Sequence, residues 1–369
     1  MKKILFLIHD LGHGGAEKVL VNLVNNMDPS QFDISVTALF GGGVNEQYLK
    51  PHVRYRTVFK RSFPGNSHLL KLFSPKALYR CIIKEHYDVV AAYLEGPSTR
   101  IISGCTDPDT KMLAWVHCAM KTEKDMACGF RSFSEARACY SKMDALVFVS
   151  QTVKEAFLSV YSFAGRTEVR YNTNDTKEIL AQAAESAKLP AESFCWCGVG
   201  KLAPVKGFDR MIRIQKRLSE GGYRTHLCIF GNGALEAELK KLTDDCGITD
   251  SVTFYGYQTN PYKYIAKCDL FVCASHSEGF STAATEALIV GTPVCTVEVS
   301  GMKELLGAHN EYGVVTENDE ESLYLAIKKL LDDPALLMHY KQQATLGGKR
   351  FRTEHTVQAV TELLMEVSQ

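Results

Sequence analysis

The sequence lacks three features that would each point to a different class of protein. None of its apolar runs reaches the about 18 residues of a membrane-spanning helix. The apolar run Ile4–Ile8, after Lys2 and Lys3, is too short for the core of a secretory signal peptide. The 12 cysteines include no C-x-x-C pair, which argues against a disulfide framework or a thiolate metal site. We therefore expect a reduced, cytoplasmic protein.

A net charge is also absent, because Lys+Arg and Asp+Glu number 42 each. This balance argues against a disordered or nucleic-acid-coating protein, so no nucleic-acid partner is expected. The 369 residues are enough for two domains of about 150–200 residues. A polar stretch, Thr173–Glu192, separates the halves, so we expect domains at residues 1–175 and 176–345. Residues 346–369 should form a helix that packs back toward the first domain.

Short apolar runs alternate with amphipathic helical segments along both halves. This alternation predicts an α/β protein whose two Rossmann-like domains each contain an open parallel sheet. The expected strands are Ile4–Ile8, Phe32–Leu39, Tyr87–Tyr93, Lys111–Val116, Ala145–Val149, Glu168–Tyr171, Phe194–Val199, His226–Phe230, Val252–Tyr255, Asp269–Ala274, Pro293–Val299 and Tyr312–Val315.

Ligands of such sheets bind beyond the carboxyl ends of the strands. In the first half, Gly14, Gly15, Glu95 and His117 directly follow expected strands. The glycine turn is not the dinucleotide fingerprint, because Glu17 stands where G-x-G-x-x-G needs its last glycine. A lone histidine is as often a structural residue as a functional one, and for His117 both interpretations stay open.

In the second half, two carboxylates flank the start of a short helix. Glu278 lies in the loop after the strand Asp269–Ala274, and Glu286 lies one turn into the helix that starts near Thr282. Such a helix start attracts anions, while a carboxylate one turn further on can accept hydrogen bonds from hydroxyls. The pattern favours a ligand that combines phosphate with hydroxyl groups, although two solvated charges around a helix start would look the same.

Other expected strand ends of the second half are followed by basic residues, glycines and an aromatic residue that could contact a ligand. Lys201 and Lys206 lie in one Gly/Pro loop, from which both ammonium groups could reach a phosphate. Gly231 and Gly233 form a second loop that permits close approach, and Tyr257 follows the next strand with a ring that could hold a base. The single D-x-D triplet, Asp107–Asp109, has the composition of a turn, so no metal site is expected.

Residues 54–84 are unusually basic for a neutral chain. They hold no Asp or Glu and eight basic residues, Arg54, Arg56, Lys60, Arg61, Lys71, Lys76, Arg80 and Lys84. Phe and Leu residues lie between them, a mixture that favours an anionic membrane surface or an anionic lipid-linked ligand. An ordinary solvated helix and loop would have a similar composition, so this alternative stays open.

Together these motifs resemble those of glycosyltransferase family 4, whose members share the GT-B architecture of two Rossmann-like domains around a central cleft. Each motif is weak alone, but their order and spacing are specific and cover nearly the whole chain. They are Gly14-Gly15-Ala16-Glu17, Gly200-Lys201-Leu202, Lys206-Gly207-Phe208-Asp209, Gly231-Asn232-Gly233, Val252-x-Phe254-x-Gly256, Glu278-Gly279-Phe280 and Glu286-Ala287.

The resemblance implies retaining, metal-independent sugar transfer from a nucleotide-sugar, with UDP favoured, to a glycan or lipid-linked acceptor. No cofactor beyond this co-substrate is implied. The residues implied to be catalytic are His117, Lys206 and Glu278. Those implied to bind the donor are Gly15, Lys201, Lys206, Gly231, Gly233, Tyr257, Gly279, Phe280, Ser281, Thr282 and Glu286, while Gly14 and Glu95 lie on the acceptor side.

Within this assignment Glu278 serves the sugar, Glu286 the ribose, and the two lysines the diphosphate. The family often has Arg at the first basic position, and Lys201 lacks its bidentate fork. Two other functions remain compatible with the motifs. One is a nucleotide-sugar epimerase or phosphorylase of the same fold, and the other is a non-catalytic sugar-nucleotide-binding subunit.

Overall fold

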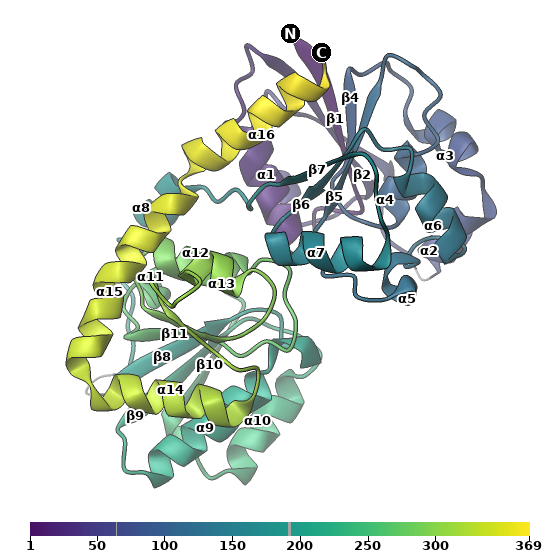
Figure 1. Cartoon of the computed structure of the whole chain (residues 1–369). Coiled ribbons are helices and arrows are strands. Elements are labelled where there is room, and N and C mark those ends of the chain that lie inside the picture. Colours follow the sequence, from purple (N-terminus) through teal and green to yellow (C-terminus); the bar gives the residue numbers. More distant parts are fainter. Residues whose placement is uncertain (64, 191–192) are drawn as a thin grey trace. The chain divides into compact units, whose positions relative to one another are not determined.

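In a computed structural model, the chain divides into two compact units, and residues 1–63, 65–190 and 193–369 are described (Figure 1). Unit 1 comprises Met1–Thr173 with Thr353–Gln369, and unit 2 comprises Asn174–Arg352. The first division, after residue 173, falls two residues before the boundary expected at 175. The second, after residue 352, falls seven residues after the boundary expected at 345. Pro64 of the basic segment and Ala191 and Glu192 of the expected linker lie outside the described residues.

Unit 1 contains a seven-stranded sheet in the order β3-β2-β1-β4-β5-β6-β7, and every pairing is parallel. The order reverses between β1 and β4, so their carboxyl ends flank the place where such sheets bind ligands. The strands are β1 (Lys2–Ile8), β2 (Phe32–Phe40), β3 (Arg54–Phe59), β4 (Val89–Ala92), β5 (Lys111–Val116), β6 (Ala145–Phe148) and β7 (Arg166–Val169).

The central strands of unit 1 are apolar because they are covered on both faces. Ile4–Ile8 of β1 are fully buried, as the short continuous apolar run predicts. β3 was not among the strands expected from the sequence. It is an edge strand whose residues are exposed or half-buried, so it lacks an apolar pattern.

Helices complete unit 1, and the C-terminal helix belongs to it. Lys2 Nζ donates to Ser368 O at 2.7 Å, and Arg170 Nε donates to Ala359 O at 2.9 Å. Val360, Leu363 and Leu364 of this helix are buried, and it packs against α1. The helices are α1 (Gly15–Asn26), α2 (Asn66–Leu72), α3 (Pro75–Ile82), α4 (Pro97–Ile102), α5 (Glu123–Met126), α6 (Phe133–Tyr140), α7 (Gln151–Val160) and α16 (Thr353–Val367).

Unit 2 contains a six-stranded parallel sheet in the order β10-β9-β8-β11-β12-β13. Here the order reverses between β8 and β11. Its core is apolar, and Trp196, fully buried on β8, donates its ring N–H to Gln215 Oε1 at 2.7 Å. The strands are β8 (Phe194–Val199), β9 (Thr225–Phe230), β10 (Val252–Gly256), β11 (Leu270–Cys273), β12 (Val294–Val297) and β13 (Val314–Thr316).

Helices cover both faces of the second sheet, with α9, α10 and α14 on one side and α11, α12 and α13 on the other (Figure 1). They are α8 (Thr176–Ala183), α9 (Phe208–Glu220), α10 (Glu236–Asp245), α11 (Tyr262–Ile265), α12 (Thr282–Ile289), α13 (Met302–Leu306), α14 (Glu320–Asp332) and α15 (Pro334–Gly348). Within the described residues, no helix is long and apolar enough to cross a membrane.

Candidate functional site

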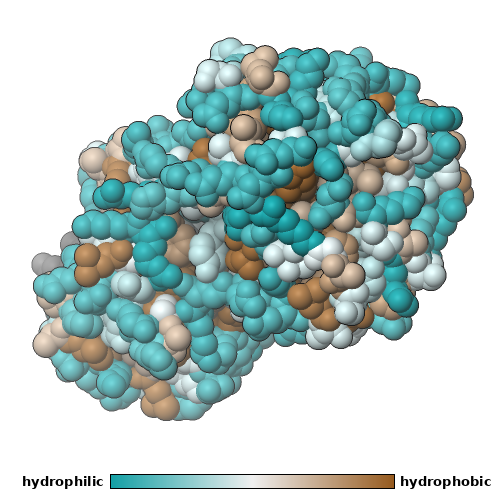
Figure 2. All heavy atoms as spheres, turned by 45° about the horizontal axis from the view of Figure 1, so that its top comes forward, coloured by the Kyte–Doolittle hydropathy of each residue, from teal (hydrophilic) through white to brown (hydrophobic). Residues whose placement is uncertain are grey.

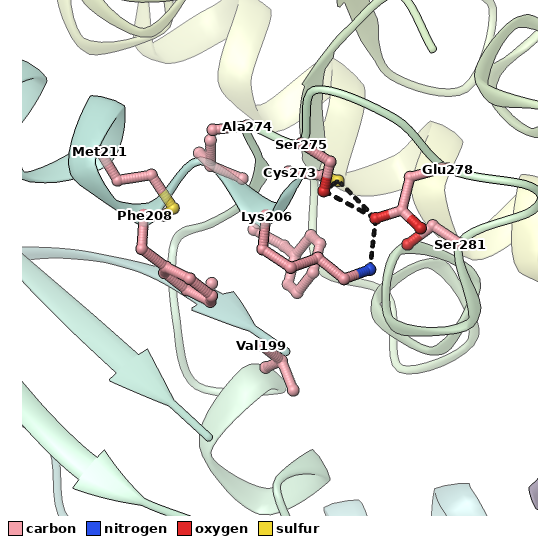
Figure 3. Close-up of a pocket in the computed structure, with 12 residues that line it drawn as sticks. Val199, Lys206, Phe208, Met211, Cys273, Ala274, Ser275, Glu278 and Ser281 are labelled. Atoms are coloured by element: carbon pink, nitrogen blue, oxygen red, sulfur yellow. Dashed lines mark hydrogen bonds and ion pairs between the residues drawn. The ribbon is translucent and has the colours of Figure 1, made fainter. Parts of the chain in front are cut away.

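Glu278 lies at the centre of a hydrogen-bonded group in unit 2 (Figure 3). Its Oε1 accepts hydrogen bonds from Lys206 Nζ at 2.6 Å and from Ser275 Oγ at 2.7 Å. Cys273 Sγ lies 3.9 Å from the same oxygen. Short bonds between ionised groups are the stronger kind, so this group is firmly held.

Both partners of this ion pair keep hydrogen-bonding capacity. Within the described part of the chain, the hydrogen bonds to Glu278 all end on Oε1. The other oxygen, Oε2, therefore remains available to accept from hydroxyl groups. Lys206 has three N–H donors and gives one of them to Glu278, so two remain for an anion.

Backbone contacts between two loops place Lys206 beside Glu278. Lys206 ends a 3₁₀ turn, Pro204–Lys206, after β8, and the N–H of His276 donates to Val205 O at 2.8 Å. Gly207 follows with φ of 65°, and a side chain there would overlap the carbonyl of Ala274 at the end of β11. The glycine thus permits the close approach of the loops after β8 and β11.

A small cavity lies next to the ion pair. Its volume is about 10 Å³, room for about one water molecule. Val199, Phe208 and Met211 form an apolar wall, and Ser275 and Glu278 contribute polar atoms (Figure 3). The cavity is therefore too small to hold a nucleotide.

The loop after Glu278 leads into the start of α12. Ser281 caps this helix, since its Oγ accepts from the N–H of Ala284 at 3.3 Å. No acidic residue lies in the first turn, so the positive end of the helix dipole is not neutralised there. Thr282, the first residue of α12, is at this end, where an anion is favoured.

Phe280 was expected to bind the donor, and its side chain is 6% exposed and packed against Phe351 at a ring separation of 5.7 Å. Gly301, with φ of 79°, packs closely against Gly279 O and the Phe280 ring. The ring therefore anchors the loop, which leaves the backbone of Gly279 and Phe280 as the part that could face a ligand.

Glu286 is buried within α12, at 5% exposure. Tyr262 on α11 donates its hydroxyl to Glu286 Oε1 at 3.1 Å. A carboxylate can accept several hydrogen bonds, so this contact orients the group without using its full capacity. Tyr262 and Ser275 are contributors that our sequence analysis did not select. The signal for Ser275 was its place directly after the strand, beside the residues that we did select.

The remaining selected residues of unit 2 lie at neighbouring strand ends. Lys201 is exposed after β8, Gly231 and Gly233 follow β9, and Tyr257, 51% exposed, follows β10. A side chain at Gly231 or Gly233 would overlap the backbone of Gly200 or Leu202. These glycines thus serve loop-to-loop packing, a reason independent of any ligand.

In unit 1, His117 and Glu95 are connected. The backbone N–H of His117 donates to Glu95 Oε2 at 3.1 Å, and the imidazole packs against the ring of Tyr93. Burial lowers the pKa of His117 although the charge of Glu95 opposes the shift. His117 Nε2 is buried and has no hydrogen-bond partner among the described residues. Such an atom in a folded protein calls for a water or a ligand.

The glycine loop of unit 1 is shaped by its own carboxylates. A side chain at Gly14 would overlap the carboxylate of Glu17, and one at Gly12 would approach Asp10 Oδ1. Burial raises the pKa of Glu17, with Asp10 adding to the shift. A hydrogen bond from His9 at 2.7 Å lowers the pKa of Asp10. Gly14 and Gly15 were selected for close approach to a ligand, which stays a prediction, and a side chain at Gly14 would also displace the Glu17 carboxylate.

No group of three His, Cys, Asp or Glu residues is placed to hold a metal ion within residues 1–63, 65–190 and 193–369. In the D-x-D triplet, Asp107 Oδ2 instead lies 2.7 Å from His86 Nδ1, and Asp107 Oδ1 accepts from the N–H of Asp109. That contact pattern is the turn that the sequence indicated.

Comparison with known proteins identifies each half of the chain. A family model described as "Glycosyltransferase Family 4" matches residues 13–178, and one described as "Glycosyl transferases group 1" matches residues 182–346. An N-acetylgalactosamine-N,N'-diacetylbacillosaminyl-diphospho-undecaprenol 4-alpha-N-acetylgalactosaminyltransferase of Campylobacter jejuni is 28% identical, covering 95% of this chain and 96% of its own. The lipopolysaccharide core biosynthesis glycosyltransferase LpsD of Rhizobium meliloti is 26% identical, and the match covers 98% of this chain and 96% of LpsD.

Solved structures show the same fold. Anabaena HepE in complex with UDP and glucose superposes with a TM-score of 0.80 at 19% identity, covering 99% of this chain and 100% of that one. Sucrose-phosphate synthase from Thermosynechococcus elongatus superposes with a TM-score of 0.81 at 18% sequence identity, and the match covers 99% of each chain. With both halves matched and two parallel α/β sheets in place, the chain belongs to the family 4 glycosyltransferases of GT-B fold.

Proposed function

We propose that this glycosyltransferase uses a UDP-sugar and transfers the sugar, with retention of its anomeric configuration, to a lipid-linked glycan. The observation that carries the proposal is the Lys206–Glu278–Ser275 group at the point where the order of the second sheet reverses. Sheets of this type bind ligands there. A carboxylate suits sugar hydroxyls, and a cation beside it suits a diphosphate.

The proposed roles follow from what each group can donate or accept. Glu278, through Oε2, and the backbone of Gly279–Ser281 hold the sugar. Glu286, oriented by Tyr262, accepts from the ribose hydroxyls. Lys201, Lys206 and the start of α12 stabilise the negative charge that grows on the leaving diphosphate. Such preorganised charge can lower the barrier without a metal ion.

Unit 1 supplies the catalytic imidazole in this proposal. Because burial lowers the pKa of His117, the ring is neutral at pH 7 and its Nε2 can donate to or accept from a sugar hydroxyl. Glu95, which holds the backbone of His117, and the Gly14–Gly15 turn belong to the acceptor side. Glu17 lies beside this turn, and burial raises the pKa of its carboxyl group.

Two names among the similar proteins support the choice of ligands. The Campylobacter relative is named for an undecaprenyl-diphosphate-linked acceptor, and three of the similar structures are HepE bound to UDP, UDP and glucose, or UDP-glucose. At 28% and 19% identity these names motivate the choice of UDP and of a lipid-linked acceptor for testing.

The decisive experiment has two steps. A thermal-shift panel of UDP-, GDP- and ADP-sugars identifies the donor, and we expect UDP-sugars to give the largest shifts. The selected donor is then incubated, in buffer with EDTA, with short-chain polyprenyl-diphosphate glycans, and the anomer of the product is read by NMR. An inverted product, a requirement for metal, or interconversion of the donor without transfer would each contradict the proposal.

A further inference from the structure

The corner between α2 and α3 in unit 1 exposes apolar side chains next to basic ones. Leu69, Leu72 and Phe73 are 38%, 74% and 50% exposed, and Lys71 and Lys76 lie beside them in sequence. We call these five residues the α2–α3 corner. The face shown in Figure 2 is largely hydrophilic with smaller apolar patches. Single apolar residues on a surface are normal, but a cluster is characteristic of a binding surface.

Within each helix, the spacing separates exposed residues from buried ones. Leu69 and Leu72 are three positions apart in α2 and so share a face, while Leu70 between them is buried at 6% exposure. In α3, Lys76 and Arg80 are four positions apart and both exposed, whereas Leu78 is buried. The corner thus combines buried residues, Leu70 and Leu78, with neighbouring exposed residues that are apolar or basic.

The positive charge of the corner is not neutralised by the protein. In the part of the chain that the structure describes, no carboxylate lies within 4.0 Å of the ammonium of Lys71 or Lys76. Arg54, further back on β3, differs, because it pairs with Asp33 and Glu85. The attraction of Lys71 and Lys76 for an external anion is therefore not weakened by an ion pair within the protein.

A buried ion pair holds the corner in place. Arg100 on α4 is 1% exposed, donates to Leu70 O at 2.9 Å and to Phe73 O at 2.7 Å, and pairs with Glu135 at 2.9 Å. Arg131 also donates to Phe73 O, at 3.1 Å. Exposed Leu72 and Phe73 thus sit on a fixed backbone, so little conformational entropy would be lost when they are covered.

We propose that the α2–α3 corner docks on an anionic lipid bilayer, with Leu72 and Phe73 entering the headgroup region and Lys71 and Lys76 beside the lipid phosphates. An apolar face bordered by Lys is the composition of a membrane-surface helix. The centre of a protein–protein interface is, by contrast, depleted in Lys. The purpose of docking rests on the proposed lipid-linked acceptor, but the binding itself requires neither donor nor acceptor.

Vesicle flotation of the full chain tests this surface without any reaction. We expect the protein to float with phosphatidylcholine vesicles that contain phosphatidylglycerol, to stay behind with phosphatidylcholine alone, and to be released by salt. Each basic residue near an anionic surface is worth about a fivefold change in partition. Lys71→Gln with Lys76→Gln should therefore weaken binding by about 25-fold. The double variant Leu72→Ser, Phe73→Ser should abolish flotation.

Matched control variants carry the same changes on unit 2. Lys241→Gln with Lys341→Gln removes two exposed lysines, and Leu325→Ser with Met338→Ser removes two apolar side chains that are 53% and 56% exposed. Both controls should float like wild type, and the melting temperatures of all four variants should stay near wild type. Binding that ignores anionic lipid, or equal losses in the control variants, would overturn the proposal.

Size-exclusion chromatography with light scattering separates a lipid surface from an interface between two copies. If Leu72→Ser, Phe73→Ser converts a dimer into a monomer while flotation persists, the corner is a protein interface and the lipid proposal is wrong. Since flotation uses no sugar nucleotide, failure of the proposed UDP-sugar transfer would leave this result unaffected, and failure of flotation would leave the transfer assay unaffected.

Discussion

Lys206 and Glu278 form a 2.6 Å ion pair across 72 positions of the chain, at the ends of the neighbouring strands β8 and β11. Lys303 and Glu298 form a pair of the same length on the surface. The side chains of the first pair are 28% and 10% exposed, and those of the second are 53% and 45% exposed. The two pairs thus have the same length and differ in burial, and the surface pair provides a matched control.

Lys206→Ala should lower kcat for sugar transfer by about 100-fold, because the leaving diphosphate loses a preorganised cation. The affinity for UDP should change less, since Lys201 and the start of α12 remain. Steady-state kinetics with the donor identified by thermal shift measures both. Lys303→Ala is the control and should leave kcat and KM unchanged. A similar kcat for the two variants would remove Lys206 from the mechanism.

Glu286→Ala should raise the Kd for the nucleotide about tenfold, since hydrogen bonds to a charged group are each worth about 1.5 kcal/mol or more. Tyr262→Phe removes only the hydroxyl that orients this carboxylate, so its effect should be smaller and in the same direction. Titration calorimetry with UDP alone isolates the ribose contribution. Undiminished UDP binding by Glu286→Ala would show that this carboxylate does not hold the ribose.

His117→Gln should reduce transfer strongly and leave the Kd for UDP unchanged, because its proposed role is in catalysis. Burial lowers the pKa of His117 from its usual 6.5, so the ring titrates below that pH. In wild type, the fall of kcat/KM that reports protonation of His117 should thus lie below pH 6.5. A fall centred above pH 6.5 that vanishes in His117→Gln would contradict a neutral buried ring.

Glu17→Gln should become more stable relative to wild type as the pH rises from 4.5. Burial raises the pKa of Glu17 above its usual 4.5, so over that window the native state keeps a proton that the unfolded chain has released. Stability of the wild type then falls with rising pH, whereas the glutamine variant has no such proton. Urea denaturation at a series of pH values gives both free energies of unfolding.

Asp10→Asn provides the control of opposite sign. The hydrogen bond from His9 lowers the pKa of Asp10 below its usual 3.8. The ionised Asp10 therefore stabilises the fold above pH 3.8, and this stabilisation is lost as the pH falls through the lowered pKa. The deficit of Asp10→Asn should therefore shrink in acid. If both variants showed the same pH trend, the two carboxyl groups would not have opposite shifts.

Arg100→Leu should destabilise the fold by about 3–5 kcal/mol, because it leaves the partly buried Glu135 without its buried partner and removes one hydrogen bond each from the carbonyl groups of Leu70 and Phe73. Burial alone would raise the pKa of Glu135, but hydrogen bonds from Arg100 and Arg131 outweigh it and lower that pKa. Arg213→Ala, which breaks exposed pairs with Asp209 and Glu320, should cost less than about 1 kcal/mol. Equal losses in denaturant unfolding would mean that burial of Arg100 adds nothing.

Much of the fold could be predicted because buried parallel strands are apolar along their whole length. β1, β8 and β11 were readable as short apolar runs that end in polar or glycine-rich turns. β3 was missed because an exposed edge strand carries charged residues and no such run. At β7 the expected strand, Glu168–Tyr171, starts two residues later than the observed Arg166–Val169, since its half-buried residues mark no clear boundary.

The roles of individual side chains were harder to predict, because they depend on neighbours that are distant in sequence. Phe280 looks like a loop residue beside a ligand, yet its ring packs on Phe351, 71 positions away. No local pattern reveals such contacts.

Apart from β3, the sequence by itself determined which segments form strands, which residues follow them, and therefore which chemical groups stand at the carboxyl edges of the two sheets. Local apolar pattern and turn residues suffice for that. Only the tertiary structure decided that β8 and β11 are neighbours, that Lys206 pairs with Glu278, and that Arg100 fixes the exposed α2–α3 corner. The physical reason is that strand order and buried ion pairs depend on packing between segments far apart in the chain.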